Sequence, residues 1–528
     1  MTVVTQKALT RWIIVGTLLV AGACAPTSEA SVTGQSASLS VPEATRVLSF
    51  GFDNIRNRHI EAMAVRAMAQ EGLQGLSTID PAISGRIEGN QVILTHNGAT
   101  IATYAAPAEN DSGAWARILV AAFQDGQKVS APLAAADAEG LYEAVFVPTL
   151  AKLDRFSRYS GVEKAKQLRS NRTGFGGVGI RFEVEEHGVS VLEATEDGPA
   201  AKAGLTSGDI ITHIDGAPTA GLDAQQVADR LRGAIGSNVS LTVTRADQNR
   251  TVALRRSLVV PNTVTMKIED DTAVIRITSF NQRTGAQTTE AVREAREQLG
   301  DRLKGVVLDL RGNPGGLLDQ AVHVADLFMK EGPIVSTRGR HTQANQFYSA
   351  RPGDIGEDLS VVVLVDGRSA SSSEIVTSAL QDSGRAVVIG TNSYGKGTVQ
   401  TVLRMPNEGE MTITWSRYYS PAGYALHNLG VLPNICTSDE TANPVGLINA
   451  VMTGTTTVSS ELAQWRATSF EQTDLREQLR THCPSQQHAD YKMDLELAKQ
   501  VLSNKDLYRR AVNLSTPGAT IQAAMHHD

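Results

Sequence analysis

Short apolar runs alternate with stretches of helical periodicity between residues 259 and 440. Apolar side chains fill almost every position of these runs, which is typical of strands that are covered on both faces of a sheet. The alternation of the two patterns predicts an α/β domain over 259–440. The expected strands are 273–277, 305–310, 361–365 and 386–389, and the expected helices are 286–299, 317–329 and 372–381.

Residues 169–258 follow another pattern, in which short strands and glycine-marked turns surround one amphipathic helix. Asp223 stands at the expected N-cap of that helix, 223–231, where a carboxylate can accept hydrogen bonds from free backbone amides. The pattern predicts a β-rich domain with one principal helix. The expected strands are 189–192, 209–214, 239–244 and 251–254.

The regions on either side of these two domains have mostly helical patterns. Within 43–168, two strand patterns flank Asn97 and Gly98, a pair that strongly favours a hairpin turn. Residues 441–528 are predicted to be helical and carry no recognisable chemistry. The helices expected in the N-terminal region are 55–76, 114–123 and 138–152.

The first 42 residues do not fit a folded domain. Lys7 and Arg11 precede an apolar run that is too short to span a membrane but has the length of a signal-peptide core. We therefore expect a signal peptide at 1–24 and an exported protein. Residues 25–42 are rich in Ser, Thr, Ala and Gly, which predicts a flexible linker.

Cys24 leaves two interpretations of the mature N-terminus. The residues before it resemble a bacterial lipobox, with Ala21 where Leu or Val usually stands, so Cys24 is a candidate lipid anchor. The alternative is ordinary cleavage after an A-x-A stretch. Cys436 and Cys483 are either a disulfide or two buried thiols, and we expect the disulfide in an oxidising compartment.

Composition and charge narrow the class of protein. With 528 residues, 41% hydrophobic and 20% charged, the chain has the profile of a multidomain soluble protein. Its formal net charge is −7, and it has no dense block of lysine and arginine. Nucleic acid is therefore not an expected partner.

Four serines cluster between residues 369 and 373, after a predicted buried strand and at the start of a predicted helix. A serine there has its oxygen near free backbone amides that can bind an oxyanion. The spacing of Ser371 and Glu374 is equally that of a capping box. The serine motif alone therefore assigns no function.

Lys396 lies between two glycines and leads into an apparent strand. Because side chains repeat every two residues along a strand, Lys396 and Gln400 are expected on one face. A lysine acts as a general base only when desolvation lowers its pKa, and the Gln400 amide would hold its amine in place. The alternative is a solvated lysine in a turn.

A third candidate is the glycine-rich turn that ends the predicted strand 305–310. Backbone amides of Gly315 and Gly316 in this turn are candidate oxyanion donors. The alternatives are a tight strand-to-helix connection or a phosphate loop. The phosphate loop requires Gly-Lys-Ser/Thr after the glycines, and Leu317 follows instead.

Residues 174–179 match the G-x-G-x-x-G dinucleotide pattern, but a strand follows them where that fold requires a helix. A glycine-rich turn that enters a strand suits the capture of a peptide's C-terminal carboxylate, with the peptide added as an extra strand. The candidate binding residues are Gly177, Val178, Gly179 and Ile180.

Other catalytic classes lack their motifs. There is no G-x-S-x-G, HExxH or CxxC pattern, so neither a metal nor another cofactor is expected. His427 and His482 are expected to be surface or packing residues.

The combined motifs resemble the carboxyl-terminal processing proteases, also called tail-specific proteases. The resemblance covers about residues 140–436 and implies a ClpP/crotonase-like α/β protease core with an inserted PDZ domain, between helical N- and C-terminal regions. The segments that carry it are 153–159, 308–316, 369–374, 381–386, 395–400, 417–423 and 430–434.

The resemblance also assigns roles. The nucleophile is the second serine of S-x-S-x-S-E, here Ser371, with Lys396 as its base 25 residues later and Gln400 as third member. Asp382 has a supporting role, and the amide of Ser372 joins one from the Gly315–Gly316 turn as the oxyanion hole.

Two positions depart from the family pattern. Ser372 replaces the usual Ala, which leaves the backbone amide unchanged, and Asn434 stands where Asp is common.

The expected function is that of an exported serine endopeptidase of the periplasm or the outer face of a bacterial membrane. Its PDZ domain would recognise proteins with apolar C-termini, and an envelope adaptor protein is a further candidate partner. A non-enzymatic PDZ scaffold is one alternative. Another is a protease in which the PDZ domain gates the active site until a tail binds.

Overall fold

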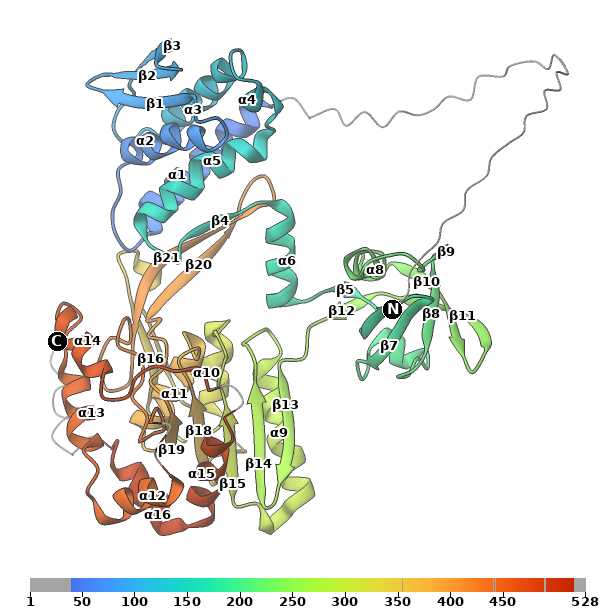
Figure 1. Ribbon diagram of the computed structural model, residues 1–528, viewed down its shortest axis with the longest axis vertical. Helices are drawn as coiled ribbons and strands as arrows, with labels where there is room; N and C mark the ends of the chain where they lie inside the picture. The colour runs from blue at the N-terminus through green and yellow to red at the C-terminus, as the bar shows by residue number, and fades with distance from the viewer. Residues whose placement is uncertain (1–38, 354, 440, 442, 489–490, 517–528) are drawn as a thin grey trace, which may run out of the picture.

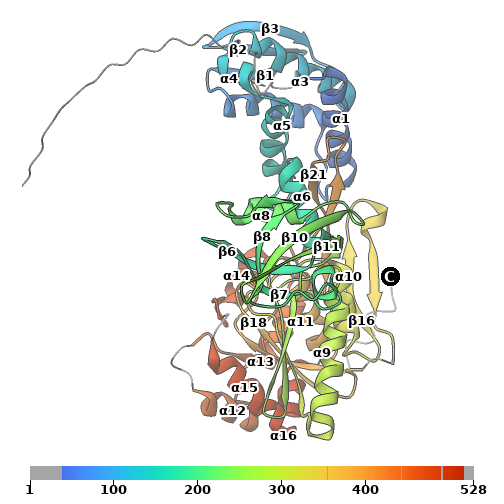
Figure 2. The same ribbon diagram turned by 90° about the vertical axis from the view of Figure 1, so that its right-hand side faces the viewer.

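The computed structural model describes residues 39–353, 355–439, 441, 443–488 and 491–516. The expected signal peptide at 1–24, Cys24 and most of the linker lie outside these residues. Figures 1 and 2 show an elongated molecule, with a helix-rich region at one end, a large α/β region at the other and a smaller β-rich unit beside them. No helix among the described residues is long and apolar enough to cross a membrane.

The N-terminal region packs four long helices under a three-stranded sheet. The hairpin at Asn97 and Gly98 is confirmed, with Asn97 at a φ of 49°. The prediction of a single helix at 55–76 is wrong, because the first helix ends at Arg58 and the next begins at Val65. The ring of His59, which caps the first helix, is buried against Asp154, 95 residues along the chain. The elements are α1 (Val41–Arg58), α2 (Val65–Gly75), β1 (Ile83–Glu88), β2 (Gln91–His96), β3 (Ala99–Ala105), α3 (Ser112–Gln127), α4 (Ala131–Ala135) and α5 (Ala138–Leu153).

The β-rich unit has a hydrophobic core of its own. Its sheet has the order β11-β10-β8-β7-β6, so β6 is an edge strand. Asp223 caps helix α8 in a capping box with Gln226, as the sequence predicts. The elements are α6 (Val162–Thr173), β5 (Phe175–Gly177), β6 (Ile180–Glu185), β7 (Gly188–Ala194), α7 (Pro199–Lys202), β8 (Ile210–Ile214), β9 (Ala217–Pro218), α8 (Ala224–Leu231), β10 (Asn238–Arg245), β11 (Gln248–Arg255) and β12 (Ser257–Val259).

A six-stranded sheet of order β13-β14-β15-β18-β19-β22 forms the centre of the α/β region. Its strands run parallel except β13, and helices α9, α10 and α11 cover one face. The expected α/β class is confirmed. The elements are β13 (Val264–Glu269), β14 (Thr272–Ile277), α9 (Thr284–Leu299), β15 (Gly305–Asp309), α10 (Leu318–Asp326), β18 (Ser360–Val365), α11 (Ser372–Asp382), β19 (Ala386–Gly390) and β22 (Ile435–Cys436).

The C-terminal helices divide between the two faces of this sheet. The helices at 444–453, 492–503 and 505–513 contribute to the buried cluster on the other face, and those at 458–467 and 473–480 contribute to the cluster of the first face. Leu497 and Val501 belong to the same buried cluster as Val362 and Ile389. The sheet strands are therefore apolar on both faces because helices cover both. Figure 1 shows the helices of the other face at the lower end of the molecule. The elements are α12 (Pro444–Thr453), α13 (Val458–Ala467), α14 (Thr473–Arg480), α15 (Lys492–Ser503) and α16 (Lys505–Asn513).

A second sheet joins the α/β region to the N-terminal region. Its longest strands form a hairpin whose buried residues Met405, Met411 and Ile413 belong to the hydrophobic core of the N-terminal region. The hairpin therefore ties the two ends of the molecule together. The elements are β4 (Arg158–Ser160), β16 (Pro333–Arg338), β17 (Gln346–Ser349), β20 (Thr398–Arg404) and β21 (Glu410–Tyr419).

Candidate active site

Ser371 differs from the other clustered serines in what its hydroxyl does. The hydroxyls of its three neighbours donate to carbonyls of the glycine-rich segment 310–316, and all three residues are buried. Ser371 is partly exposed, and its hydroxyl donates no hydrogen bond among the described residues. The hydrogen-bonded pairs of hydroxyl donor and carbonyl acceptor are Ser369 with Leu310, Ser372 with Gly316 and Ser373 with Asn313.

The backbone of Ser371 is strained. Its φ of 56° and ψ of −112° are unusual for a residue with a side chain. Such strain costs about 1 to 3 kcal/mol and persists where the surrounding structure imposes it, often at functional sites. Three serine hydroxyls that fasten this turn to the segment 310–316 provide that restraint.

Glu374 joins the Ser371 turn to the Lys396 turn. Its Oε2 accepts from the amides of Ser371, at 2.7 Å, and Lys396, at 2.9 Å. Its Oε1 accepts from the amide of Gly395 and the hydroxyl of Ser393. Burial raises the pKa of Glu374, and these four donors oppose that shift. The backbones of Ser371 and Lys396 thus lie within hydrogen-bonding reach of one oxygen atom.

Tyr418 makes a second connection between the same two turns. Its buried hydroxyl lies 2.5 Å from the carbonyl oxygen of Lys396 and 3.2 Å from that of Ser371. Burial raises the pKa of Tyr418, and the nearby Glu374 carboxylate raises it further, so the phenol keeps its proton. Two buried side chains therefore fix the spacing of the Ser371 and Lys396 turns.

The environment of Lys396 favours its neutral form. Burial lowers the pKa of Lys396, and the Arg158 guanidinium lowers it further, whereas the carboxylates of Glu374 and Asp154 act in the opposite direction. The ammonium lies 5.1 Å from the centroid of the Phe156 ring. Among the described residues it has no hydrogen bond or ion pair. A lysine in such surroundings can accept a proton near neutral pH.

Lys396 lies outside the strand that carries Gln400. Strand β20 begins at Thr398, and its pairing with β21 shifts in register between Val399 and Gln400. Strand alternation therefore does not relate the two residues, and their position on one face stays a prediction. The Gln400 Nε2 donates to the hydroxyls of Thr398, at 2.9 Å, and Thr414, at 3.3 Å.

A polar network continues from Gln400 into the N-terminal region. Thr414 donates its hydroxyl proton to Asp154 at 3.0 Å, and Asp154 lies 2.9 Å from the buried ring of His59. Burial would raise the pKa of Asp154, but hydrogen bonds from His59 and Ser157 lower it overall. The strand beside Lys396 is thereby anchored to the end of helix α1.

The predicted oxyanion donors are not equivalent. Gly315 packs so closely on the Ser371 turn that a Cβ on Gly315 would lie 2.8 Å from that of Ser371. The Gly315 amide donates to the Asn313 side chain. The amides of Ser372 and Gly316 have no acceptor among the described residues. Ser372 and Gly316 therefore carry the amides that are free to bind an oxyanion.

Asp382 lies at the other end of helix α11 from Ser371. Its carboxylate accepts from Arg466 of α13 at 2.6 Å and from the amide of Ala422 at 3.0 Å. It therefore fixes the far end of α11 to the C-terminal region, well away from Ser371.

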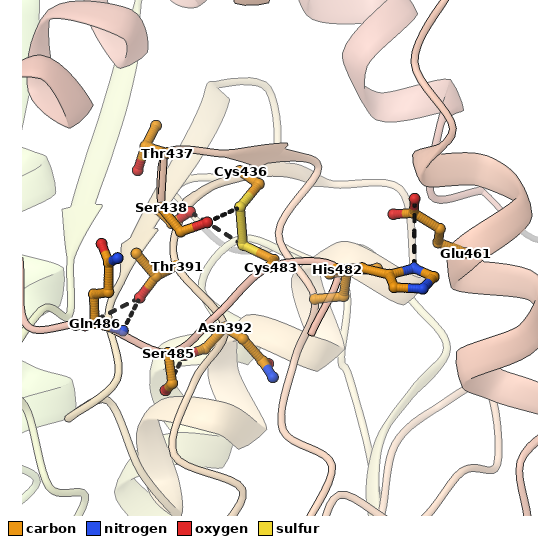
Figure 3. The surroundings of a disulfide bond; sticks show 12 residues. Thr391, Asn392, Cys436, Thr437, Ser438, Glu461, His482, Cys483, Ser485 and Gln486 are labelled. Carbon is orange, nitrogen blue, oxygen red and sulfur yellow. Dashed lines mark hydrogen bonds and ion pairs between the residues drawn. A yellow bond between two sulfur atoms is a disulfide. The ribbon is translucent and has the colours of Figure 1, made fainter. Parts of the chain in front are cut away.

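Cys436 and Cys483 form a disulfide. Figure 3 shows the bond beside the segment that leads from β19 toward Lys396. There, Ser485 donates to the carbonyl of Asn392 at 2.7 Å, and Thr391 donates to the carbonyl of Gln486 at 3.1 Å. The disulfide thus holds a C-terminal segment against the approach to the Lys396 turn.

The glycine-rich loop of the β-rich unit opens a small groove. Val178 and Gly179 have no hydrogen bond on their amides among the described residues. A cavity of about 140 Å³ lies between this loop and helix α8, beside edge strand β6. Its walls are mostly apolar and comprise Phe175, Gly177, Val178, Gly179, Ile180, Phe182, Ala228, Leu231, Arg232 and Val259.

Sequence reasoning missed Glu374, Tyr418 and Phe156 as parts of the site. Glu374 had a signal, its capping-box spacing, which indicates a helix cap but not the contacts with the Lys396 turn. Tyr418 and Phe156 lie in segments that resemble the family, but no local pattern indicates their contacts. Among the described residues, no group of three or more His, Cys, Asp or Glu side chains could hold a metal ion.

Comparisons with known proteins identify the family of this chain. The model of peptidase family S41 matches residues 271–437, and that of the PDZ domain matches 176–255. The carboxy-terminal-processing protease of Bartonella bacilliformis is 39% identical over 303 residues, which span 57% of this chain and 70% of that protein. The chain belongs to the carboxy-terminal-processing proteases of peptidase family S41. This S41 protease is therefore a serine-type peptidase with a PDZ domain.

Other members of the family are more distant. A probable CtpA-like serine protease of Staphylococcus aureus is 32% identical over 285 residues, 53% of this chain and 57% of that protein. The chain thus spans somewhat over half the length of this staphylococcal relative. The photosystem II D1 C-terminal processing protease has 30% identity and a TM-score of 0.34, over 58% of this chain and 86% of that one.

Proposed function

We propose that this S41 protease is an exported endopeptidase that binds the C-terminal tail of a protein through its PDZ domain and cleaves it with Ser371 and Lys396. The observation that carries the proposal is the shared Glu374 oxygen, which accepts from the amides of both residues. This oxygen links the backbone of a serine whose hydroxyl donates no hydrogen bond among the described residues to that of a lysine whose pKa is lowered by burial.

In the first half of the reaction, Ser371 Oγ attacks the carbonyl carbon of the scissile peptide bond. The neutral amine of Lys396 takes the hydroxyl proton, and the amides of Ser372 and Gly316 stabilise the oxyanion. The C–N bond then breaks, and Lys396 returns the proton to the leaving amine. The product is an ester between Ser371 and the acyl part of the substrate.

In the second half, a water molecule attacks this ester, and Lys396 accepts a proton from the water. The tetrahedral intermediate collapses, and Lys396 returns the proton to Ser371 Oγ. Gln400 orients the Lys396 amine in this scheme. Both of its hydrogen bonds use Nε2, which leaves Oε1 as an acceptor for the amine. Asp382 supports the site indirectly, by holding the far end of helix α11.

The PDZ groove supplies the tail-binding step. A peptide that pairs with edge strand β6 brings its terminal carboxylate to the free amides of Val178 and Gly179. Gly177 and Ile180 flank these amides and complete the binding loop. The apolar lining of the adjacent cavity favours an apolar last residue. Protein substrates with apolar C-termini follow from this geometry.

The proposed location is the periplasm or the outer face of a bacterial membrane. The apolar run at 12–23 supports export, and the Cys436–Cys483 disulfide fits an oxidising compartment. Cys24 is the candidate membrane anchor, and mass spectrometry of the mature N-terminus tests it. An envelope adaptor protein is a candidate partner.

The deciding experiment is the Ser371→Ala variant, assayed on a protein with an apolar tail. Cleavage should fall at least a thousandfold, because the nucleophile is gone while the fold is retained. Ser383→Ala, which removes a hydroxyl at the other end of α11, should cleave at the wild-type rate. Full cleavage by Ser371→Ala rejects the assignment, and tail binding by the wild type without turnover indicates a scaffold.

A further inference from the structure

A second cavity lies behind the Lys396 turn. It has a volume of about 270 Å³ and opens between helix α14 and the segment around Asn428. Its other lining residues come from the C-terminal region, outside the segment that matches family S41. The lining comprises Asn428, Phe470, Thr473, Arg476, Glu477 and Arg480.

The cavity has two arginines without an acidic partner. Arg476, only 1% exposed, donates to the carbonyls of Ala425 and His427, and its Nε has no partner. Arg480 donates to the carbonyls of Leu429 and Ser393. Among the described residues, no carboxylate forms an ion pair with either guanidinium. Burial lowers the pKa of both arginines, whereas the carboxylate of Glu471 acts in the opposite direction on Arg476 and that of Glu374 does so on Arg480.

Several cationic side chains lie around the cavity, and Glu471 is an exposed carboxylate near two of them, Arg417 and Arg476. The centroid of the Phe470 ring lies 4.1 Å from the Arg417 guanidinium and 5.9 Å from the Arg476 guanidinium. Burial lowers the pKa of His427 to about 4, and three arginines including Arg417 and Arg476 contribute to the shift. Glu477 is the single acidic residue of the lining, and it is exposed at the rim.

The cavity is adjacent to the reacting groups. The amide of Asn428 donates to the carbonyl of Gly395 at 2.8 Å, and Arg480 Nη1 lies 3.2 Å from where a Cβ of Gly395 would be. The centroid of the Phe156 ring lies 5.1 Å from Lys396 Nζ and 6.1 Å from the centroid of the His427 ring. A peptide bound near Lys396 therefore has the cavity within reach of its neighbouring residues.

We propose that this arginine pocket binds a carboxylate of the substrate peptide, and so selects tails with an acidic group near the cleaved bond. This inference rests on the proposed function for the position of the peptide. Carboxylates suit the site because guanidinium donors bind them with short, charge-assisted hydrogen bonds. The carboxylate is either an Asp or Glu side chain or the free end of the tail.

The test uses synthetic twelve-residue peptides with an apolar C-terminal residue and one Glu placed at each internal position in turn. Matched peptides carry Gln instead of Glu. Affinity is measured by fluorescence anisotropy with the Ser371→Ala protein, so the result does not depend on cleavage. At one position the Glu peptide should bind about tenfold more tightly than the Gln peptide.

A matched pair of variants locates the preference. Thr473 is exposed and begins helix α14, where an acidic residue is well tolerated. Thr473→Glu places a carboxylate at the pocket and should reduce the Glu/Gln affinity ratio to near one. Thr473→Gln, of nearly the same size, should retain the ratio. This comparison depends on charge and leaves the buried contacts of the two arginines in place.

Peptides with a free or an amidated C-terminus distinguish the two sources of carboxylate. If the end of the tail is the ligand, Thr473→Glu reduces the ratio of the affinities for the free and the amidated peptide, and leaves the Glu/Gln ratio unchanged. Either result supports the pocket. The proposal is overturned if neither the Glu/Gln affinity ratio nor the free/amidated affinity ratio differs between Thr473→Glu and Thr473→Gln. Loss of wild-type cleavage with the binding preference intact would instead contradict the proposed function alone.

Discussion

At the scale of single residues, the proposed mechanism predicts that the pKa of Lys396 determines the pH range of activity. Only the neutral amine can take a proton from Ser371, and burial lowers the pKa of Lys396 toward the range where that amine is populated. Activity therefore increases as pH rises through the pKa of Lys396 in the folded enzyme. Below it, log kcat/KM should rise by about one per pH unit.

Removal of a neighbouring cation tests this dependence. Arg158→Gln removes the guanidinium that helps to lower the pKa of Lys396, so that pKa should rise. The ascending limb of the pH profile of kcat/KM should then move to higher pH. Arg181→Gln, which changes an exposed arginine of the PDZ domain, is the control. An unshifted limb in Arg158→Gln would contradict the role of Lys396 as base.

The nucleophile could be assigned from the sequence only through the family resemblance. Four serines within five residues share the same local pattern, and nothing local separates them. The structure separates them by partners 56 to 60 residues away, because three of the hydroxyls bind carbonyls of the glycine-rich segment. Such distant contacts leave no periodic signal in the sequence.

At the scale of elements, the C-terminal region supports both sides of the site. Arg480 of α14 holds the carbonyl of Ser393 next to the Lys396 turn. Asp494 of α15 contacts Arg311, which begins the glycine-rich turn of the oxyanion amides. A region that carries no catalytic motif therefore contacts both segments to which the proposed function assigns catalytic groups.

The Cys436–Cys483 disulfide secures this support. It closes a segment of 47 residues, and loop closure of that size stabilises a fold by about 2 to 4 kcal/mol. The Cys436→Ser/Cys483→Ser double variant should lose that amount in the unfolding transition of the α/β region, measured with denaturant. The wild type in reducing agent should show the same loss. Equal stability of all three samples would exclude a stabilising role.

Asn434 illustrates what the sequence alone could not explain. Its Oδ1 accepts from the amide of Val388, and its Nδ2 donates to the carbonyl of Ala511 in α16 and to Ser515. The Asp that is common in the family has no proton to donate at this position. The substitution therefore follows from the C-terminal helix that covers this sheet.

Local patterns predicted the regular elements and failed where distant contacts decide. The continuous apolar run at 361–365 is sufficient to predict β18, and Asp223 is sufficient to predict the start of α8. The break after His59 depends on Asp154, and the shifted register at Gln400 depends on pairing with β21. These contacts join residues that no window along the chain contains together.

At the scale of the whole molecule, the PDZ domain is a separable unit. It has its own hydrophobic core and leaves the chain through the paired strands β5 and β12, where Gly177 lies opposite Ser257. Opposite residues of paired strands can be joined by a short turn. The domain can therefore be removed with little change to the chain on either side.

A variant that lacks residues 178–256, with Gly177 joined to Ser257 by Asn-Gly, tests its role. Cleavage of a tailed protein should fall at least tenfold, through KM, because the tail is no longer captured. Cleavage of a short peptide without the apolar tail should be unchanged. A higher rate on both substrates would instead show that the PDZ domain inhibits the site.

The hairpin of β20 and β21 couples the two ends of the molecule. Met405, Met411 and Ile413 complete the N-terminal core, while β20 begins two residues after Lys396. Removal of the N-terminal region would therefore expose these three buried side chains on the hairpin that follows Lys396. A protein that binds the N-terminal helices is therefore expected to change the activity of the enzyme through this hairpin, without contact with the peptide substrate.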